Sequence, residues 1–249
     1  MRALIPALDD NVDVHGHYAS GWLDRGGIRA NFVCSVDGAV HSAGVSRGLQ
    51  TRGDNTVFGV LRDLADVVLV GAGTAVAEVY APARFSERRR GIRRELGLRA
   101  SMPVAVLSRT LRLDPNSPLF ADATSEDRTI VLTCAAADHV ARRALQRVAD
   151  VVECGDEMVD SVLLRRALEE RGLTRILSEG GPTVFGGLVR DGVVNELCLS
   201  VTPLLVGAGP GRIVNGRDWP APEALSLAGM LEDDSALFLR YAIRPQETT

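Results

Sequence analysis

The sequence predicts an α/β fold: a single domain with a mostly parallel central sheet, helices on both faces and an antiparallel C-terminal strand. Short apolar runs of strand length alternate with segments in which apolar residues recur every three or four positions. This alternation is typical of βαβ units, whose strands lie parallel in one sheet. The predicted strands are residues 28–36, 66–71, 103–108, 129–133, 150–154, 175–177, 194–203 and 236–243.

The helices predicted between these strands are residues 56–65, 136–149, 160–171 and 182–190. Asp54 or Asn55 is expected to cap the first of them. No break in composition divides the chain, so residues 28–249 are expected to form one domain. Residues 1–27 are expected to form an irregular N-terminal arm, which Tyr18 and Trp22 could pack onto that domain.

The composition excludes several classes of function. A net charge of −4 and an aromatic content of 4% disfavour a nucleic-acid binder. All 28 basic residues are arginine, and without lysine neither a Walker P-loop nor a Schiff-base enzyme is possible. The four cysteines lack metal-ligand spacing, so we expect no metal site and a reducing, cytoplasmic environment. No apolar run reaches the ~18 residues of a membrane span.

The strongest functional motif is the stretch Ser178–Gly187, SEGGPTVFGG, which follows a predicted strand and begins a predicted helix. The free N–H groups and the positive dipole end of a helix start form a natural anion site. Pro182 suits the first helical turn, and the carboxylate of Glu179 could orient a polar ligand. On spacing alone, a tight turn that uses glycine only for geometry is an equal alternative.

Polar residues accompany the first predicted strand. Asn31, Ser35 and Asp37 fall on one face of it, which indicates either a ligand cleft or an edge strand with one wet side. The polar, glycine-rich residues 39–55 that follow are typical of a functional loop.

A glycine turn, Gly71-Ala-Gly-Thr74, follows the second predicted strand. Val76 stands where a Rossmann fingerprint has its third glycine, so that fold is not expected. In a parallel sheet the carboxyl ends of the strands meet at one edge, which would bring Thr74, Ser108 and Gly180–Gly187 together.

Residues 84–99 hold seven arginines against two glutamates. Such a run is usually a solvated, partly helical face, and this interpretation is favoured. The alternative is that it attracts an anionic substrate or a cofactor phosphate.

Four motifs occur together: NFVCSVDG at 31–38, DLADVVLVGAGT at 63–74, SEGGPT at 178–183 and VNELCLSVTPLLVG at 194–207. In order and spacing, along about residues 28–243, they resemble the pyrimidine reductase of riboflavin biosynthesis. That family is often the C-terminal half of a bifunctional deaminase–reductase. The resemblance implies a dihydrofolate-reductase-like domain that binds NADPH, transfers a hydride to a small heterocycle and forms a homodimer.

The resemblance also implies roles for residues at matching positions. Substrate contacts are expected from Asn31, Ser46, Arg84 and Glu179. Asp37 and Glu179 are the acids expected to steer the proton that accompanies hydride transfer. Cofactor contacts are expected from Cys34, Gly48, Gly73, Thr74, Glu78, Ser108, Gly180, Gly181, Pro182, Thr183, Val184, Phe185, Gly186 and Gly187.

The sequence departs from the family pattern in three places. The deaminase motifs H-x-E and P-C-x-x-C are absent, the segment Glu78–Arg84 lacks the family's D-D-P-x-L-T pattern, and Asn31 stands where some members carry lysine. The substrate is therefore expected to be a 5-amino-6-ribosylaminouracil 5′-phosphate-like pyrimidine or a pteridine such as dihydrofolate. The alternative is a non-catalytic NADP(H)-binding protein of the same fold.

Overall fold

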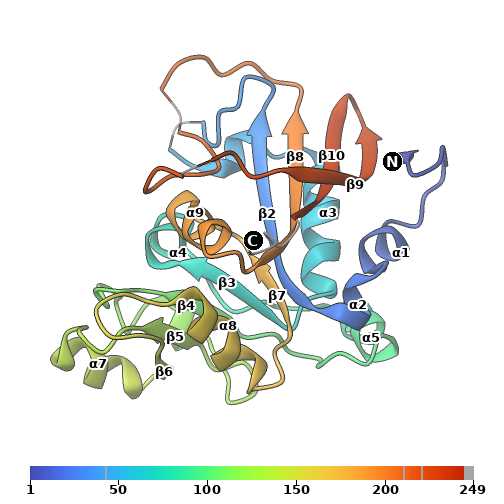
Figure 1. The fold of residues 1–249 in the computed structure, drawn as a ribbon. Helices are drawn as coiled ribbons and strands as arrows, with labels where there is room; N and C mark the ends of the chain where they lie inside the picture. The colour runs from blue at the N-terminus through green and yellow to red at the C-terminus, as the bar shows by residue number, and fades with distance from the viewer. Residues whose placement is uncertain (43, 210, 220, 244–249) are drawn as a thin grey trace, which may run out of the picture.

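The fold is built around a single mixed sheet (Figure 1). The structure is a computed structural model, and it describes residues 1–42, 44–209, 211–219 and 221–243. The strand order of its ten described strands is β1-β9-β10-β8-β2-β7-β3-β4-β5-β6. The strands are β1 (Arg2–Ile5), β2 (Gly27–Ser35), β3 (Val67–Gly71), β4 (Val104–Leu107), β5 (Ile130–Thr133), β6 (Asp150–Glu153), β7 (Arg175–Ser178), β8 (Val194–Thr202), β9 (Leu225–Asp233) and β10 (Ala236–Ile243).

All pairings from β8 to β6 are parallel, whereas β10, β9 and β1 join the other side of β8 in antiparallel pairs. The predicted parallel sheet with an antiparallel C-terminal strand is therefore confirmed. The sequence did not predict β1 or β9. Residues 244–249, the end of the predicted domain, lie outside the described residues.

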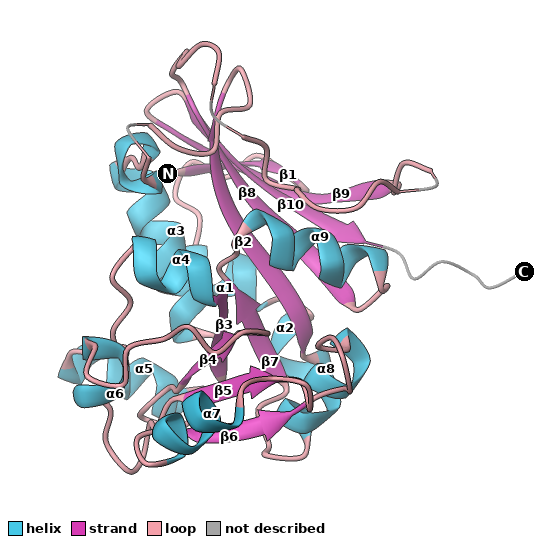
Figure 2. Cartoon of the chain, turned by 90° about the vertical axis from the view of Figure 1, so that its left-hand side faces the viewer, coloured by secondary structure: helices cyan, strands magenta, loops and turns pink. Residues whose placement is uncertain are grey.

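Helices cover both faces of the sheet. They are α1 (Val14–Ala19), α2 (Trp22–Arg25), the 3₁₀ helix η1 (Ser46–Leu49), α3 (Arg52–Asp63), α4 (Ala72–Ala77), α5 (Glu87–Glu95), α6 (Pro118–Ala121), α7 (His139–Gln146), α8 (Ser161–Glu169) and α9 (Pro182–Arg190). Along β3, Val68 and Val70 pack into a core shared with α3, while Val67 and Leu69 pack into a core shared with α8 and α9. This alternation of a fully buried strand gives the domain two hydrophobic cores. Figure 2 shows α3 and α9 on opposite sides of β2.

Helix α3 starts earlier than its apolar spacing predicts. Thr51 is its cap, and the Thr51 hydroxyl accepts a hydrogen bond of 3.1 Å from the N–H of Asp54. The prediction that Asp54 or Asn55 caps this helix is wrong, because both residues lie inside its first turn. The side chain of Asp54 is consequently available for another role.

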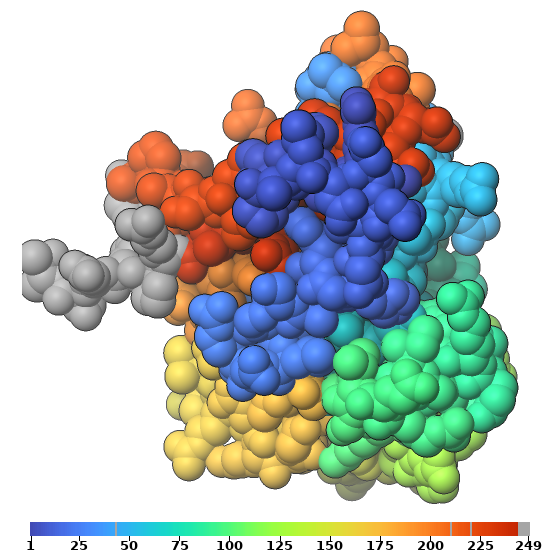
Figure 3. Space-filling model, turned by 90° about the vertical axis from the view of Figure 1, so that its right-hand side faces the viewer, coloured from blue at the N-terminus to red at the C-terminus, as the bar shows by residue number. Residues whose placement is uncertain are grey.

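The N-terminal segment is part of the domain and not an irregular arm. β1 extends the sheet by pairing with β9, and two short helices follow it. Tyr18 and Trp22 are 1% and 3% exposed, which confirms that they pack onto the domain. The space-filling view shows this blue segment lying against the red C-terminal strands (Figure 3). The strand was missed because four residues carry too little pattern without their partner.

The arginine-rich segment forms helix α5 and has a structural role. Arg93 is fully buried, and its guanidinium donates hydrogen bonds to the carbonyls of Arg62, Asp63 and Ala65 at 2.8–3.0 Å. These are the free carbonyls at the end of α3, so Arg93 caps that helix. Burial lowers the pKa of Arg93 to about 10. The predicted solvated helical face is thus correct only for the outer residues of α5.

No described helix is both long and apolar enough to cross a membrane.

Candidate active site

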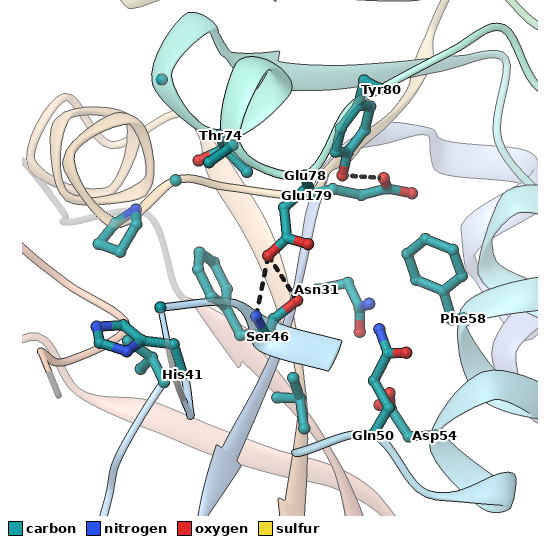
Figure 4. A pocket seen from close by; sticks show the side chains of 18 residues that line it. Asn31, His41, Ser46, Gln50, Asp54, Phe58, Thr74, Glu78, Tyr80 and Glu179 are labelled. Carbon is teal, nitrogen blue, oxygen red and sulfur yellow. Dashed lines mark hydrogen bonds between the residues drawn. The ribbon is translucent and has the colours of Figure 1, made fainter. Parts of the chain in front are cut away.

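A cavity of about 250 Å³ lies where β2, α3 and α4 meet the turn after β7 (Figure 4). It is lined by Asn31, Phe32, Val33, Val40, His41, Gly44, Ser46, Gln50, Asp54, Phe58, Gly73, Thr74, Ala77, Glu78, Tyr80, Glu179, Gly181 and Pro182. The parallel strands β3 and β7 end at its wall, as expected for a ligand site of an open α/β sheet.

Glu179 is the most constrained acid of this cavity. Its carboxylate is 3% exposed and accepts hydrogen bonds of 2.7 Å from Nε and Nη2 of Arg62 and from the hydroxyl of Tyr80. Burial, followed by the charge of Glu179, raises the pKa of Tyr80 well above 10, so this hydroxyl keeps its proton. Glu179 therefore presents a fixed negative charge that Arg62 balances.

Glu78 connects the loop after β2 to α4. One of its carboxylate oxygens accepts hydrogen bonds of 2.9 and 3.0 Å from the N–H and the hydroxyl of Ser46. Figure 4 shows this pair in the middle of the cavity, with His41 on the same loop. The contact holds Ser46 against the site, so Glu78 shapes the cavity by fixing the loop at this residue.

The turn from β7 into α9 approaches α4 closely. A Cβ atom on Gly181 would lie 2.4 Å from the hydroxyl oxygen of Thr74, and Gly180 has a φ of +91°. Position 180 therefore favours glycine for its backbone conformation, and a side chain at position 181 would require Thr74 or the turn to move. Among the described residues no side chain caps α9, so the N–H groups of its first turn remain available to an anion.

A second cavity of about 230 Å³ lies along α9. It is lined by Leu107, Arg109, Met158, Val159, Ser161, Thr183, Val184, Gly186, Gly187, Leu188, Arg190, Asp191, Asn215, Gly216 and Arg217. Gly186 has no room for a side chain, because its Cβ would lie 2.4 Å from the carbonyl oxygen of Asn215. The cavity thus combines a tight backbone approach with three guanidinium groups.

The structure brings most of the predicted site residues to these two cavities. The first receives Asn31, Ser46, Gly73, Thr74, Glu78, Glu179, Gly181 and Pro182, and the second receives Thr183, Val184, Gly186 and Gly187. Two other predicted residues line neither cavity but pack against residues next to the first one. Phe185 is buried with its ring centroid 4.9 Å from that of Phe32, and Gly48 lies under Ser42.

Asp37 lies outside both cavities. Its exposed carboxylate accepts hydrogen bonds from the Ser35 hydroxyl and from the N–H groups of Val206 and Gly207. The Ser35 contact, then the two backbone contacts, lower the pKa of Asp37 to about 2. Asp37 therefore holds the loop after β8 and lines neither of these two cavities, and its expected role beside the reacting ring stays a prediction.

Three further residues lie away from the cavity walls. The Arg84 side chain is 60% exposed, donates hydrogen bonds to Asp127 and to the carbonyl of Asp122, and lines neither cavity. The Ser108 hydroxyl accepts a hydrogen bond of 3.0 Å from the N–H of Leu111. Cys34 is buried beside the first cavity without lining it.

Sequence reasoning missed one wall of the first cavity. Asp54, Phe58 and Arg62 line or brace it from successive turns of α3, and Gln50 and Tyr80 add polar groups. The spacing of four residues between the three α3 positions puts them on one helix face. That pattern is visible in the sequence and could have identified this wall.

Comparisons with known proteins show the family and the fold that this chain shares. The family model of the RibD C-terminal domain matches residues 27–238. A relative from Archaeoglobus fulgidus named 2,5-diamino-6-ribosylamino-4(3H)-pyrimidinone 5′-phosphate reductase is 26% identical over 194 residues, which cover 78% of this chain and 84% of the relative. The crystal structure of a pyrimidine reductase-like protein from Corynebacterium diphtheriae has a TM-score of 0.84 and 25% identity, covering 94% of this chain and 99% of that one.

A more distant structure shares the fold. It is the diaminohydroxyphosphoribosylaminopyrimidine deaminase/5-amino-6-(5-phosphoribosylamino)uracil reductase of Thermotoga maritima, with a TM-score of 0.66 and 19% identity. The match covers 89% of this chain and 57% of that one. The predicted resemblance is confirmed, since the family model spans most of the sequence. The chain belongs to the RibD C-terminal domain family.

Proposed function

We propose that the chain is an NADPH-dependent reductase that transfers a hydride to a ribosylaminopyrimidine 5′-phosphate. The observation that carries the proposal is the position of the two cavities at the start of α9. The first cavity reaches Gly181 and Pro182, and the second begins at Thr183 and Val184. An extended dinucleotide that crosses this helix start would have one end in each cavity.

The residues present fit such a cofactor. The uncapped first turn of α9 suits the pyrophosphate, and the glycine at 181 allows it close approach. Arg109 and Arg217 line the second cavity, where they suit the 2′-phosphate that distinguishes NADPH from NADH. When bound, the reduced nicotinamide supplies the hydride.

The first cavity suits a polar heterocycle. Glu179, fixed by Arg62 and Tyr80, offers an oriented carboxylate, and the buried side-chain oxygen of Asn31 has no hydrogen-bond partner among the described residues. We assign Glu179 and Asn31 to substrate orientation. The presence of these two polar residues argues against the non-catalytic alternative, because a protein that only binds dinucleotide has no need of polar groups here.

The relatives favour a pyrimidine as the substrate. The names of the Archaeoglobus relative and of the Corynebacterium and Thermotoga structures specify pyrimidine reductases or reductase-like proteins. Dihydrofolate, the other expected substrate, gains no support from them.

A cytoplasmic homodimer is part of the proposal. The four cysteines are free and buried, which suits a reducing compartment. Leu225 and Leu227 are exposed on the part of β9 that β1 does not pair with. An unpaired strand edge that carries apolar side chains favours association with a second copy. Light scattering of the purified protein would give the mass of a dimer.

The decisive experiment is to follow NADPH oxidation at 340 nm with ribosylaminopyrimidine 5′-phosphates and, in parallel, with dihydrofolate. Oxidation that depends on the pyrimidine supports the proposal. Tight NADPH binding without turnover of any pyrimidine would favour the non-catalytic alternative. Turnover of dihydrofolate alone would contradict the assigned substrate class.

A further inference from the structure

Three carboxyl groups line the first cavity, and they differ in their partners. Glu179 is paired with Arg62, and Glu78 is held by Ser46. Asp54 is only 4% exposed, yet in the described part of the chain no cation pairs with it. A buried carboxyl group without a cation is expensive to keep, which is a reason to look for a ligand that would satisfy it.

The position of Asp54 directs it toward the cavity wall. Because Thr51 caps α3, Asp54 does not serve as the cap and instead begins the helix face that continues with Phe58. Figure 4 shows Asp54 grouped with Asn31, Gln50 and Phe58, on the side away from Thr74 and His41. The unpartnered oxygen of Asn31 belongs to the same group. This end of the cavity therefore places two hydrogen-bond acceptors, the Asp54 carboxyl and the Asn31 side-chain oxygen, beside an aromatic ring.

The two kinds of pyrimidine named for the relatives differ at the ring edge that such a wall would meet. A 2-amino-4(3H)-pyrimidinone presents two adjacent donors, the N3–H and the 2-amino group. A uracil presents one donor, the N3–H, between two carbonyl acceptors. A carboxylate accepts two hydrogen bonds from the first edge, but against the second it meets one N–H and one repelling oxygen.

We propose that Asp54 recognises the substituent at position 2 of the pyrimidine ring and so selects the 2-amino-4-pyrimidinone over the uracil. The inference rests on the proposed function and names the form of the substrate. It also orders the chemistry: hydrolytic removal of the 2-amino group would follow this reduction and not precede it.

The protonation state of Asp54 gives the proposal a signature. Burial raises the pKa of Asp54. The Ser200 side chain on β8 forms a hydrogen bond with Asp54, and this contact opposes the rise. Tyr18 on α1 lies near Asp54, and the other titratable groups that line the cavity are His41, on its far side, Glu78 and Glu179. A protonated carboxyl group offers one donor and one acceptor and thus matches uracil, whereas the ionised group matches the 2-amino ring. Preference for the 2-amino ring should therefore increase as the pH rises through the Asp54 pKa.

The test is to measure kcat/KM with NADPH for the two 5′-phosphates, 2,5-diamino-6-ribosylamino-4(3H)-pyrimidinone and 5-amino-6-ribosylaminouracil, between pH 5 and 8. The wild type should prefer the diamino compound by about tenfold or more. Asp54→Asn places an amide donor and acceptor in the same space. It should reverse the preference and remove its dependence on pH. Asp156→Asn, an exposed aspartate far along the chain, is the matched control and should leave the ratio unchanged.

The outcomes separate the inference from the proposed function. Turnover of both compounds with a ratio that neither Asp54→Asn nor pH changes would overturn the inference alone, as would a wild-type preference for the uracil. Turnover of neither compound would overturn both. The ratio measured for the wild type needs no variant, so a preference for the uracil overturns the inference even if Asp54→Asn folds poorly. The affinity of the variant for NADPH, measured by fluorescence, checks that the cofactor site is intact.

Discussion

Arg62 and Glu179 lie 117 residues apart in the sequence and meet in a two-point ion pair. Nε and Nη2 of the arginine each donate a hydrogen bond of 2.7 Å to a different carboxylate oxygen. The guanidinium also stacks 4.4 Å from the ring centroid of Phe58. The pair joins α3 to the turn after β7, so it fixes both the substrate wall and the start of the helix assigned to the cofactor.

Removal of Arg62 should destabilise the fold. Arg62→Ala leaves the Glu179 carboxylate buried without its cation, which costs about 3 kcal/mol of the free energy of unfolding. Urea denaturation measures this directly. The control is Arg166→Ala, which breaks an exposed pair with Glu170 on α8 and should cost less than about 0.5 kcal/mol. Equal losses in the two variants would mean that the buried pair adds no stability.

The close approach of Gly181 to Thr74 predicts that a larger residue at position 181 lowers the affinity for the cofactor. Gly181→Ala places a methyl group 2.4 Å from the Thr74 hydroxyl, so the Thr74 side chain and the turn at the start of α9 must move apart. The Kd for NADPH should rise by about tenfold or more, because the first-turn N–H groups move with that turn. Fluorescence titration measures the change. The control is Gly91→Ala in α5, because a Cβ atom there would have no described atom within 4 Å outside its own helix turn. This variant should leave the Kd unchanged.

The preference for NADPH over NADH should depend on Arg109. This residue directly follows Ser108 at the end of β4 and lines the second cavity. Arg109→Ala should weaken NADPH binding by about tenfold to a hundredfold and leave NADH binding unaltered, since a charged hydrogen bond is worth about 1.5–3 kcal/mol. Titration of both dinucleotides tests this. The exposed Arg112 supplies the control, Arg112→Ala. An equal loss for both dinucleotides would place the adenosine phosphate elsewhere.

Features set by local pattern could be predicted from the sequence. The apolar runs identified β2 to β8 and β10, and the glycines at 180 and 181 marked the turn before α9. β1 was missed because its four residues carry too little pattern without their partner β9. β9 forms a hairpin with β10, but Leu225 and Leu227 are exposed, so its apolar residues do not mark a buried face.

Side-chain partners were the least predictable part of the site. Asp37 and Arg84 have charges that suit the predicted roles, but both side chains form hydrogen bonds with loops that are distant in the sequence. Asp37 accepts from residues 206–207, and Arg84 donates to Asp122 and Asp127. In α3 the apolar spacing drew attention to the core face, which includes Val57, Val60 and Leu61. The adjacent face, with Asp54 and Arg62, was therefore overlooked. Identity alone does not show which of several acids a fold leaves facing its cavity.

Asp37 gives a pH-dependent prediction that tests its assignment to the loop. Its pKa is lowered to about 2 in the folded protein, against about 3.9 in an unfolded chain. A lowered carboxyl pKa stabilises the fold above the unfolded value, and the contribution is lost as the pH falls toward the folded value. The melting temperature of the wild type should thus exceed that of Asp37→Asn at pH 5–7, and the difference should vanish near pH 2.

Activity separates this structural role from a catalytic one. Asp37→Asn should retain turnover at pH 7, because the side chain lies outside both cavities and its partners are Ser35 and the loop after β8. Ser35→Ala removes the largest cause of the lowered pKa and should reduce the pH dependence of the melting temperature in the same way. A variant at position 37 that keeps the wild-type melting curve but loses turnover would return Asp37 to the reacting centre. In that case the loop after β8 would have to rearrange when substrate binds.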